Sequence, residues 1–315
     1  MHEAARTELR VCTFRGLQNL PLYVARQQGF FAKQALDVEI VYTTGSVPQF
    51  TGLVHGAYHL VQTAPDNAIN ADDNPTAFGL DPATFPRIVM LFGGSTGALS
   101  LFAQPAITKF VDLRGAVLGV DNPASGFALV LRDILARNGL DLERDYTFAV
   151  AGGTSARLTA LMSGTVIGTI LYAPFDTLAA EKGFCKLASS TDYYTAYASL
   201  STAATQTWVD THADLVIRYI TALKQALRWI YDPTHAAATQ AIMEKESALG
   251  LDATLAVKAY TAFVHPTTGF GEDGTLNEAG LQQVIDLRAT YGSPSGPQGV
   301  PANYLDLRWY RQAQI

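Results

Sequence analysis

The sequence has few cysteines and no long apolar run, which argues against a cysteine metal site and against a membrane-spanning helix. Its 315 residues contain two cysteines, Cys12 and Cys185, which form no CxxC pair and no Cys/His spacing suited to a metal. Charged residues make up 16% of the chain, and no apolar stretch is long enough to cross a bilayer. We expect a globular protein without a metal or cofactor, in which Cys12 is a buried free thiol. A disulfide between the two cysteines stays open.

The sequence also lacks the common catalytic signatures. It contains no GxSxG, HExxH, GxGxxG or P-loop motif. His55 and His59 are four residues apart, but a helix end and a strand start separate them, so they do not suit a metal site. The net charge of −6 and the isoelectric point near 5.5 disfavour nucleic acid and anionic membranes as partners. We therefore predict a protein that is not an enzyme.

The first ten residues, MHEAARTELR, have no apolar core and no cleavage site, so they do not resemble a signal peptide. Two interpretations remain open. The protein works in the cytoplasm, or a signal segment has been removed from a protein that is periplasmic or anchored by lipid outside the cytoplasm.

Short apolar strands alternate with helices over the first two-thirds of the chain, which predicts parallel βα units. The composition changes after about Trp208, where only helical spacing follows. The predicted strands are 9–14, 37–43, 59–63, 87–92, 99–103, 116–120, 146–150, 169–172 and 186–188. The predicted helices are 20–28, 45–54, 125–138, 155–163, 176–182, 208–231, 234–247, 253–264, 277–291 and 304–312.

One pattern occurs twice along the chain: a turn, a helix, a glycine, a strand and an Ala-Pro pair. The first copy starts at Gly45 and passes Gly56, and the second starts at Gly153 and passes Gly164. The repetition favours two similar lobes, although any two βα units share some of these features.

Polar and glycine-rich segments follow the predicted strands. In parallel sheets, ligands bind beyond the carboxyl ends of the strands, where helix N-termini offer free N–H groups. Each hydroxyl could instead cap its helix, and Arg15 could bind a ligand anion or form a salt bridge between lobes. The predicted ligand-binding residues are Phe14, Arg15, Gln18, Gly45, Ser46, Asp66, Asn67, Ser95, Ser125, Gly126, Thr154, Tyr172 and Asp176.

Five segments carry a family resemblance: Pro21–Phe31, Gly45–Gly56, Asp112–Val120, Leu131–Leu140 and Tyr219–Ala236. In order and spacing the chain resembles the ABC-transporter substrate-binding proteins of the nitrate/sulfonate/taurine and thiamine-precursor (NMT1-like) group.

The resemblance implies an α/β fold of the type II periplasmic-binding class. Each of two lobes would hold a mainly parallel sheet flanked by helices, with helices at the C-terminus. The expected division is 9–97 for the first part of lobe 1, 98–192 for lobe 2 and 193–315 for the return to lobe 1. Two crossings, near 93–99 and 190–199, would join the lobes and let them close on a ligand.

The implied function is capture of a small polar or anionic organic molecule, such as a sulfonate or a pyrimidine, by a monomer that delivers it to a membrane permease. Two alternatives stay open: an enzyme on the same scaffold, resembling desulfinases or enzymes that make the thiamine pyrimidine, and a cytoplasmic sensor. For the enzyme, Cys12 would be the candidate nucleophile.

Overall fold

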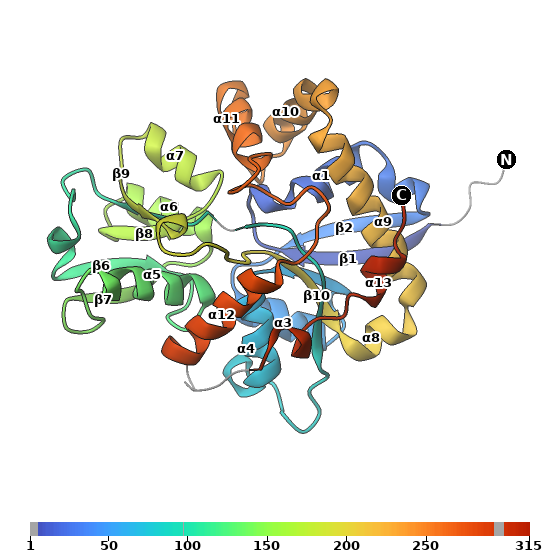
Figure 1. Cartoon of the computed structure of the whole chain (residues 1–315), viewed down its shortest axis with the longest axis horizontal. Coiled ribbons are helices and arrows are strands. Elements are labelled where there is room, and N and C mark those ends of the chain that lie inside the picture. The colour runs from blue at the N-terminus through green and yellow to red at the C-terminus, as the bar shows by residue number, and fades with distance from the viewer. Residues whose placement is uncertain (1–5, 97, 293–298) are drawn as a thin grey trace.

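The computed structural model describes residues 6–96, 98–292 and 299–315. The expectation about a leader segment therefore falls largely outside the described residues, as does Gly97 in the first predicted crossing. The described chain forms two five-stranded sheets that lie on opposite sides of the molecule, each with its own helices (Figure 1). We call each sheet with its flanking helices a lobe.

The first sheet is mainly parallel. Its strands, in the order β2-β1-β3-β10-β4, are β2 (Leu36–Tyr42), β1 (Thr7–Thr13), β3 (Leu60–Thr63), β10 (Ser201–Thr205) and β4 (Ile88–Phe92). Strand β1 runs parallel to β2 and β3, whereas β10 is antiparallel to both of its neighbours. Cys12 lies in β1 and is fully buried, and both cysteines are free thiols, as expected for Cys12.

The second sheet repeats this arrangement. Its strands, in the order β7-β6-β8-β5-β9, are β7 (Tyr146–Val150), β6 (Ala116–Val120), β8 (Gly168–Leu171), β5 (Ser100–Ala103) and β9 (Cys185–Ser189). Strand β6 is parallel to β7 and β8, and β5 is the antiparallel strand. The two copies of the sequence pattern therefore fall at equivalent places, each leading into the third strand of the sheet, and the predicted α/β fold class is confirmed.

Helices cover both sheets and form the C-terminal part of the chain (Figure 1). No helix of the described chain is both long and apolar enough to span a bilayer. The helices are α1 (Leu20–Gln27), α2 (Phe30–Lys33), α3 (Ser46–Val54), α4 (Pro65–Asp73), α5 (Gly126–Arg137), α6 (Thr154–Met162), α7 (Phe175–Glu181), α8 (Gln206–Thr211), α9 (Ala213–Tyr231), α10 (Ala236–Lys245), α11 (Ala253–Phe263), α12 (Glu278–Tyr291) and α13 (Arg308–Gln312).

Several predictions about elements were incomplete, and the short helix α2 was not predicted. Strand β10 was not predicted, because a central strand of small residues lacks the β-branched and aromatic signal. Helix α4 was not predicted either, because its sequence PDNAINADD is too polar to show an apolar face. The predicted helix 208–231 is divided at His212 into α8 and α9.

The chain passes between the lobes twice, from β4 to β5 and from β9 to β10. The two crossings lie side by side, since Ser199 N–H donates to the Ser95 carbonyl at 3.2 Å and the two hydroxyls are 2.7 Å apart. Helix α12 packs against both lobes, on α5 of the second and α4 of the first. It also lies close to the second crossing, because a Cβ on Gly280 would be 2.7 Å from the Ala198 nitrogen.

Candidate functional site

A cavity of about 140 Å³ lies between the lobes, where the carboxyl ends of β1 and β3 face those of β6 and β8. A dry cavity of about 150 Å³ in another protein holds benzene, so this space suits a small organic molecule. Its walls are Phe14, Leu17, Gln18, Thr63, Ala64, Asn67, Ser95, Ala98, Asp121, Ser125, Gly126, Phe127, Gly153, Thr154, Arg157, Tyr172, Ala173, Asp176, Ser199, Leu200, Ala262, Phe263, Thr268, Gly269 and Phe270.

The structure brings most of the predicted ligand-binding residues together in this lining. They are Phe14, Gln18, Asn67, Ser95, Ser125, Gly126, Thr154, Tyr172 and Asp176. They meet because the strand-end loops of both sheets open into the same space, and Ser125 also caps α5 through a 3.4 Å bond from Ala128 N–H. The predicted residues outside the lining are Arg15, Gly45, Ser46 and Asp66.

Asp66 is held in a buried ion pair. Arg288 donates from Nε and Nη2 to the two carboxylate oxygens of Asp66, each at 2.8 Å, and both side chains are almost fully buried. Arg288 Nη2 also donates to the Ala124 carbonyl of the second lobe at 2.9 Å. The carboxylate of Asp66 therefore links α4 to α12, and its acceptors are engaged within the protein.

Arg15 points out of the cavity lining. Its side chain is exposed, and its guanidinium carbon lies 4.5 Å from the centre of the Tyr42 ring, in cation–π geometry. Gly45 and Ser46 begin α3 outside the lining, where the Thr43 hydroxyl donates to the Gly45 carbonyl at 2.8 Å.

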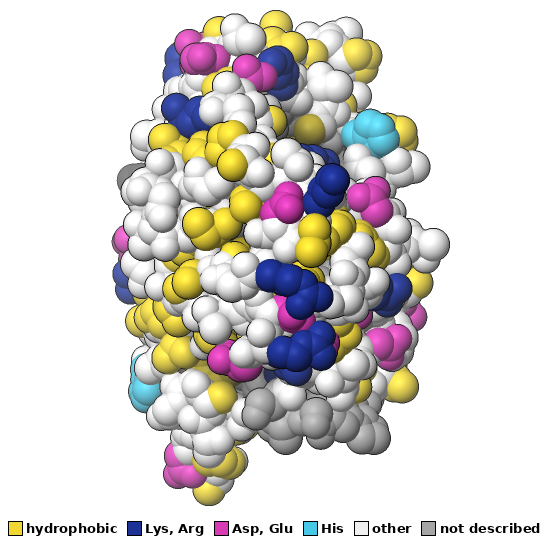
Figure 2. All heavy atoms as spheres, turned by 90° about the vertical axis from the view of Figure 1, so that its left-hand side faces the viewer, with side chains coloured by type: hydrophobic (Ala, Val, Ile, Leu, Met, Phe, Trp, Pro, Cys, Tyr) yellow, Lys and Arg dark blue, Asp and Glu magenta, His cyan; other side chains and the backbone are white. Residues whose placement is uncertain are grey.

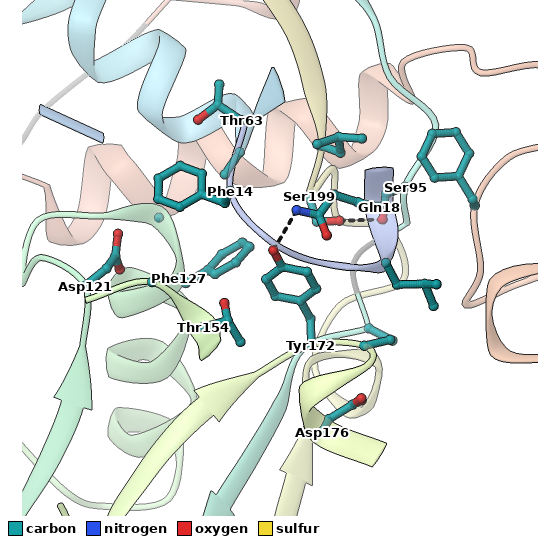
Figure 3. Close-up of a pocket in the computed structure, with 18 of the residues that line it drawn as sticks. Phe14, Gln18, Thr63, Ser95, Asp121, Phe127, Thr154, Tyr172, Asp176 and Ser199 are labelled. Carbon is teal, nitrogen blue, oxygen red and sulfur yellow. Dashed lines mark hydrogen bonds between the residues drawn. The ribbon is translucent and has the colours of Figure 1, made fainter. Parts of the chain in front are cut away.

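Hydrogen bonds between Gln18, Leu17 and Arg15 of the first lobe and Tyr172 and Ala173 of the second join the lobes across one end of the cavity. Gln18 Nε2 of the first lobe donates to the Tyr172 hydroxyl of the second at 2.7 Å, and Figure 3 shows the two side chains reaching toward each other. Next to them, Leu17 N–H donates to the Ala173 carbonyl at 3.1 Å. Burial raises the pKa of Tyr172 to about 12, so its hydroxyl stays protonated and donates to the Arg15 carbonyl.

A buried cation, Arg157, lies in the wall and was not predicted from the sequence. Its nitrogens donate to the Ile170 and Gly152 carbonyls at 3.2 Å, to the Thr154 hydroxyl at 2.9 Å and to Asp121 Oδ1 at 3.4 Å. Burial lowers the pKa of Arg157, and the nearby Asp121 carboxylate opposes that shift. The sequence gives one indication of its position: Arg157 follows Thr154 by three residues, which places both side chains on the same face of α6.

Asp121, also not predicted, comes directly after β6. Ser125 donates its hydroxyl to Asp121 Oδ1 at 2.6 Å, and this is the oxygen that Arg157 contacts. On the α7 side, Asp176 Oδ1 accepts from Thr177 N–H at 2.7 Å. Burial raises the pKa of Asp176, and its hydrogen bonds with Thr177 partly oppose that shift.

Aromatic rings supply much of the apolar wall. Phe127 and Tyr172 of the second lobe meet edge to face with centroids 5.6 Å apart, and Phe14 of the first lobe reaches Gly153. Phe263 and Phe270, near the C-terminal end of α11, stack at 5.1 Å. The segment around Phe270 is fixed to the first crossing, because Thr96 donates to the Gly269 carbonyl through its hydroxyl at 2.7 Å.

The lining offers rings, hydroxyls, amides, one guanidinium and two carboxylates, and none of its residues is a histidine, cysteine or lysine. Among residues 6–96, 98–292 and 299–315, no group of three or more His, Cys, Asp or Glu side chains is arranged to hold a metal ion. These groups can enclose and hydrogen-bond a small molecule.

Two lobes, two crossings and an interlobe cavity define the class of periplasmic-binding-protein-like folds. Residues 17–236 match the family model described as NMT1/THI5 like, and the chain belongs to that family.

Solved structures share this fold at low sequence identity. The periplasmic nitrate-binding protein NrtA from Synechocystis PCC 6803 superposes with a TM-score of 0.81 at 12% identity, covering 98% of this chain and 88% of that chain. The alkanesulfonate-binding protein SsuA from Xanthomonas axonopodis pv. citri, bound to MOPS, gives 0.75 at 17% identity, covering 96% of this chain and 100% of that chain.

Among curated proteins, the bicarbonate transport ATP-binding protein CmpC from Synechococcus elongatus is 25% identical over 240 residues. The match covers 68% of this chain and 34% of CmpC, so the chain spans about a third of the length of this relative.

Proposed function

We propose that this protein is the solute-binding component of an ABC importer and captures a small polar organic molecule between its lobes. The observation that carries the proposal is the cavity itself, which both lobes line and which the two side-by-side crossings adjoin. Each lobe supplies part of the contacts, so a bound ligand stabilises the state in which the lobes meet.

The named relatives support this proposal. NrtA and SsuA bind nitrate and an alkanesulfonate, and CmpC takes part in bicarbonate transport. By this analogy the partner is a membrane permease and the site of action is outside the cytoplasm. One lobe would consist of residues 9–97 and 193–315, and the other of residues 98–192. On the face drawn in Figure 2, Lys and Arg side chains are interspersed with Asp and Glu, which suits a protein partner better than nucleic acid.

Capture without turnover is part of the proposal. Cys12, the candidate nucleophile of the enzyme alternative, is fully buried in β1 and does not line the cavity. Burial raises the pKa of its thiol to about 11, which suppresses the reactive thiolate.

The test is a thermal-shift screen of protein that has been unfolded and refolded to remove carried-over ligand, against sulfonates, nitrate, pyrimidines, flavins and aromatic acids. A binder should raise the unfolding midpoint by several degrees and reduce the radius of gyration, and should be recovered unchanged. Chemical conversion of the ligand would overturn the proposal. Failure of the protein to bind any compound of this screen or any cationic small molecule would overturn it as well.

A further inference from the structure

The charged groups in the cavity wall are unlike those expected around an oxyanion. They are Asp121, Arg157 and Asp176, so the single cation is accompanied by two carboxyl groups. Whether Asp176 is ionised or protonated, it adds no positive charge. A nitrate or sulfonate in this space would therefore meet at least one fixed negative charge with only one cation to offset it.

Arg157 is poorly available to a ligand. Nε, Nη1 and Nη2 all donate to acceptors of the protein, and the Asp121 carboxylate already lies beside the guanidinium. The side chain is 2% exposed. To bind an anion tightly, the guanidinium would have to exchange these hydrogen bonds for contacts with the ligand.

Acidic residues also lie near the N-termini of the helices around the cavity. Their partial positive charge attracts anions, but acidic side chains of the protein lie in or next to three of them. Asp66 lies in the first turn of α4 and Asp176 in that of α7, while Asp121 receives the hydroxyl of Ser125, the N-cap residue of α5. At the N-terminus of α6, the Thr154 hydroxyl accepts from Arg157, which itself contacts Asp121.

One oxygen of the Asp121 carboxylate, Oδ2, is available as an acceptor for a ligand. Both Ser125 and Arg157 donate to Oδ1, and among the described residues no hydrogen bond reaches Oδ2. Figure 3 draws Asp121 on the side of the cavity where Phe14 and Phe127 lie. A carboxylate oxygen beside aromatic rings suits a flat molecule that carries a hydrogen-bond donor, and ring faces also attract cations.

We infer that the ligand is a small flat molecule whose donor nitrogen carries a positive charge, such as an aromatic amidinium, and that this nitrogen binds to Asp121 between the aromatic walls. This inference rests on the proposed capture function and narrows its ligand class. It sets the protein apart from relatives whose names specify nitrate, sulfonate or bicarbonate.

The test compares probes that differ in their charged group. Benzamidine, benzenesulfonate and nitrate are titrated into the refolded protein by calorimetry. Benzamidine should bind at least tenfold more tightly than either anion. Asp121→Asn, which keeps an acceptor for Ser125 and Arg157, should weaken benzamidine about tenfold to a hundredfold without weakening benzenesulfonate, because it removes a charge-assisted hydrogen bond to a cation. A variant that loses both probes alike would show damage to the site around Arg157 and would count against the inference.

Asp37→Asn is the matched control, because Asp37 is an exposed acid at the far end of β2 and its removal changes the net charge equally. It should leave the benzamidine affinity unchanged. Tighter binding of benzenesulfonate or nitrate than of benzamidine would overturn the inference and leave the capture function standing. Absence of benzamidine binding would also overturn it, and the capture function would fall only if the wider screen also found no ligand.

Discussion

Asp66 and Arg288 are 222 residues apart in sequence and form a two-point salt bridge, with both nitrogen–oxygen distances at 2.8 Å. Their side chains are 1% and 2% exposed. The pair joins α4 to α12, and α12 packs on both lobes. Asp66 therefore helps to fix the helix that spans the two halves of the molecule.

Asp66→Asn should be strongly destabilising, because it leaves the guanidinium of Arg288 buried without its counter-charge. Loss of one partner of a buried pair costs about 3–5 kcal/mol, to be measured by urea unfolding at pH 7. The control is Glu39→Gln, which breaks an exposed pair with Arg10 by the same chemical change and should cost at most about 1 kcal/mol. Equal effects of the two substitutions would contradict the assigned role of Asp66.

At Gly126 the lobes approach each other closely beside this salt bridge. A Cβ on Gly126 would lie 2.4 Å from the Cβ of Asp66, which Arg288 holds in place. Gly126→Ala should therefore keep the lobes from meeting fully and weaken ligand binding about tenfold to a hundredfold, as expected from the cost of overpacking. Small-angle scattering should show that ligand no longer compacts the variant.

Gly45→Ala is the control for this substitution. Gly45 has extended backbone, and a Cβ there would have no neighbour closer than 3.7 Å. Its ligand affinity should stay within about twofold of the wild type, because the cost of overpacking arises only where atoms overlap. Loss of affinity in Gly45→Ala, or wild-type affinity in Gly126→Ala, would refute this account.

The sequence was informative about the strand ends and uninformative about long-range pairs. Phe14, Ser125 and Thr154 follow strands, and the rule that ligands bind at carboxyl ends places them together without knowledge of packing. The same rule selected Asp66, whose partner Arg288 lies in a distant helix. Residue type alone cannot distinguish a carboxylate that binds a ligand from one that is already paired.

The C-terminal wall illustrates a second limit. Phe263 and Phe270 reach the cavity because the segment that carries them bonds to the first crossing, at Thr96 and Gly269. Nothing in the local pattern specifies that contact, and neither phenylalanine was among the predicted ligand-binding residues. Arg157 was missed for a related reason, since sequence does not reveal that a cation is buried.

Tyr172→Phe tests the hydrogen bonds that the Tyr172 hydroxyl makes between the lobes. The substitution keeps the ring but leaves Gln18 Nε2 without its 2.7 Å acceptor and the Arg15 carbonyl without its donor. Ligand affinity should fall by about three- to thirtyfold, the equivalent of one to two hydrogen bonds, in calorimetric titration. Tyr193→Phe is the control. It removes a hydroxyl that accepts from Asn138 Nδ2 at 2.8 Å, and Tyr193 lies outside the cavity lining, so this variant should bind ligand as the wild type does. If the two variants bind alike, the hydrogen bonds of the Tyr172 hydroxyl make no contribution to closure.

Asp176→Asn tests the cost of burying an acid in the cavity wall. Burial raises the pKa of Asp176, so over the range between its ordinary value and the raised one the folded protein holds a proton that the unfolded chain has released. Stability therefore falls as the pH rises through that range, and the penalty is absent below the ordinary pKa of a free aspartate. At neutral pH the amide variant should be more stable than the wild type.

The advantage of Asp176→Asn should shrink as the pH is lowered toward the ordinary pKa of aspartate, in urea unfolding from pH 7 down to pH 4. The amide can still accept from Thr177 N–H, which bonds Asp176 Oδ1 at 2.7 Å, so the comparison isolates the charge. Asp37→Asn, at an exposed position, should show no such advantage at pH 7. An Asp176→Asn variant that is less stable than the wild type by the same amount at every pH would show that the hydrogen bonds to Thr177, rather than burial of the charge, determine the contribution of this carboxyl group.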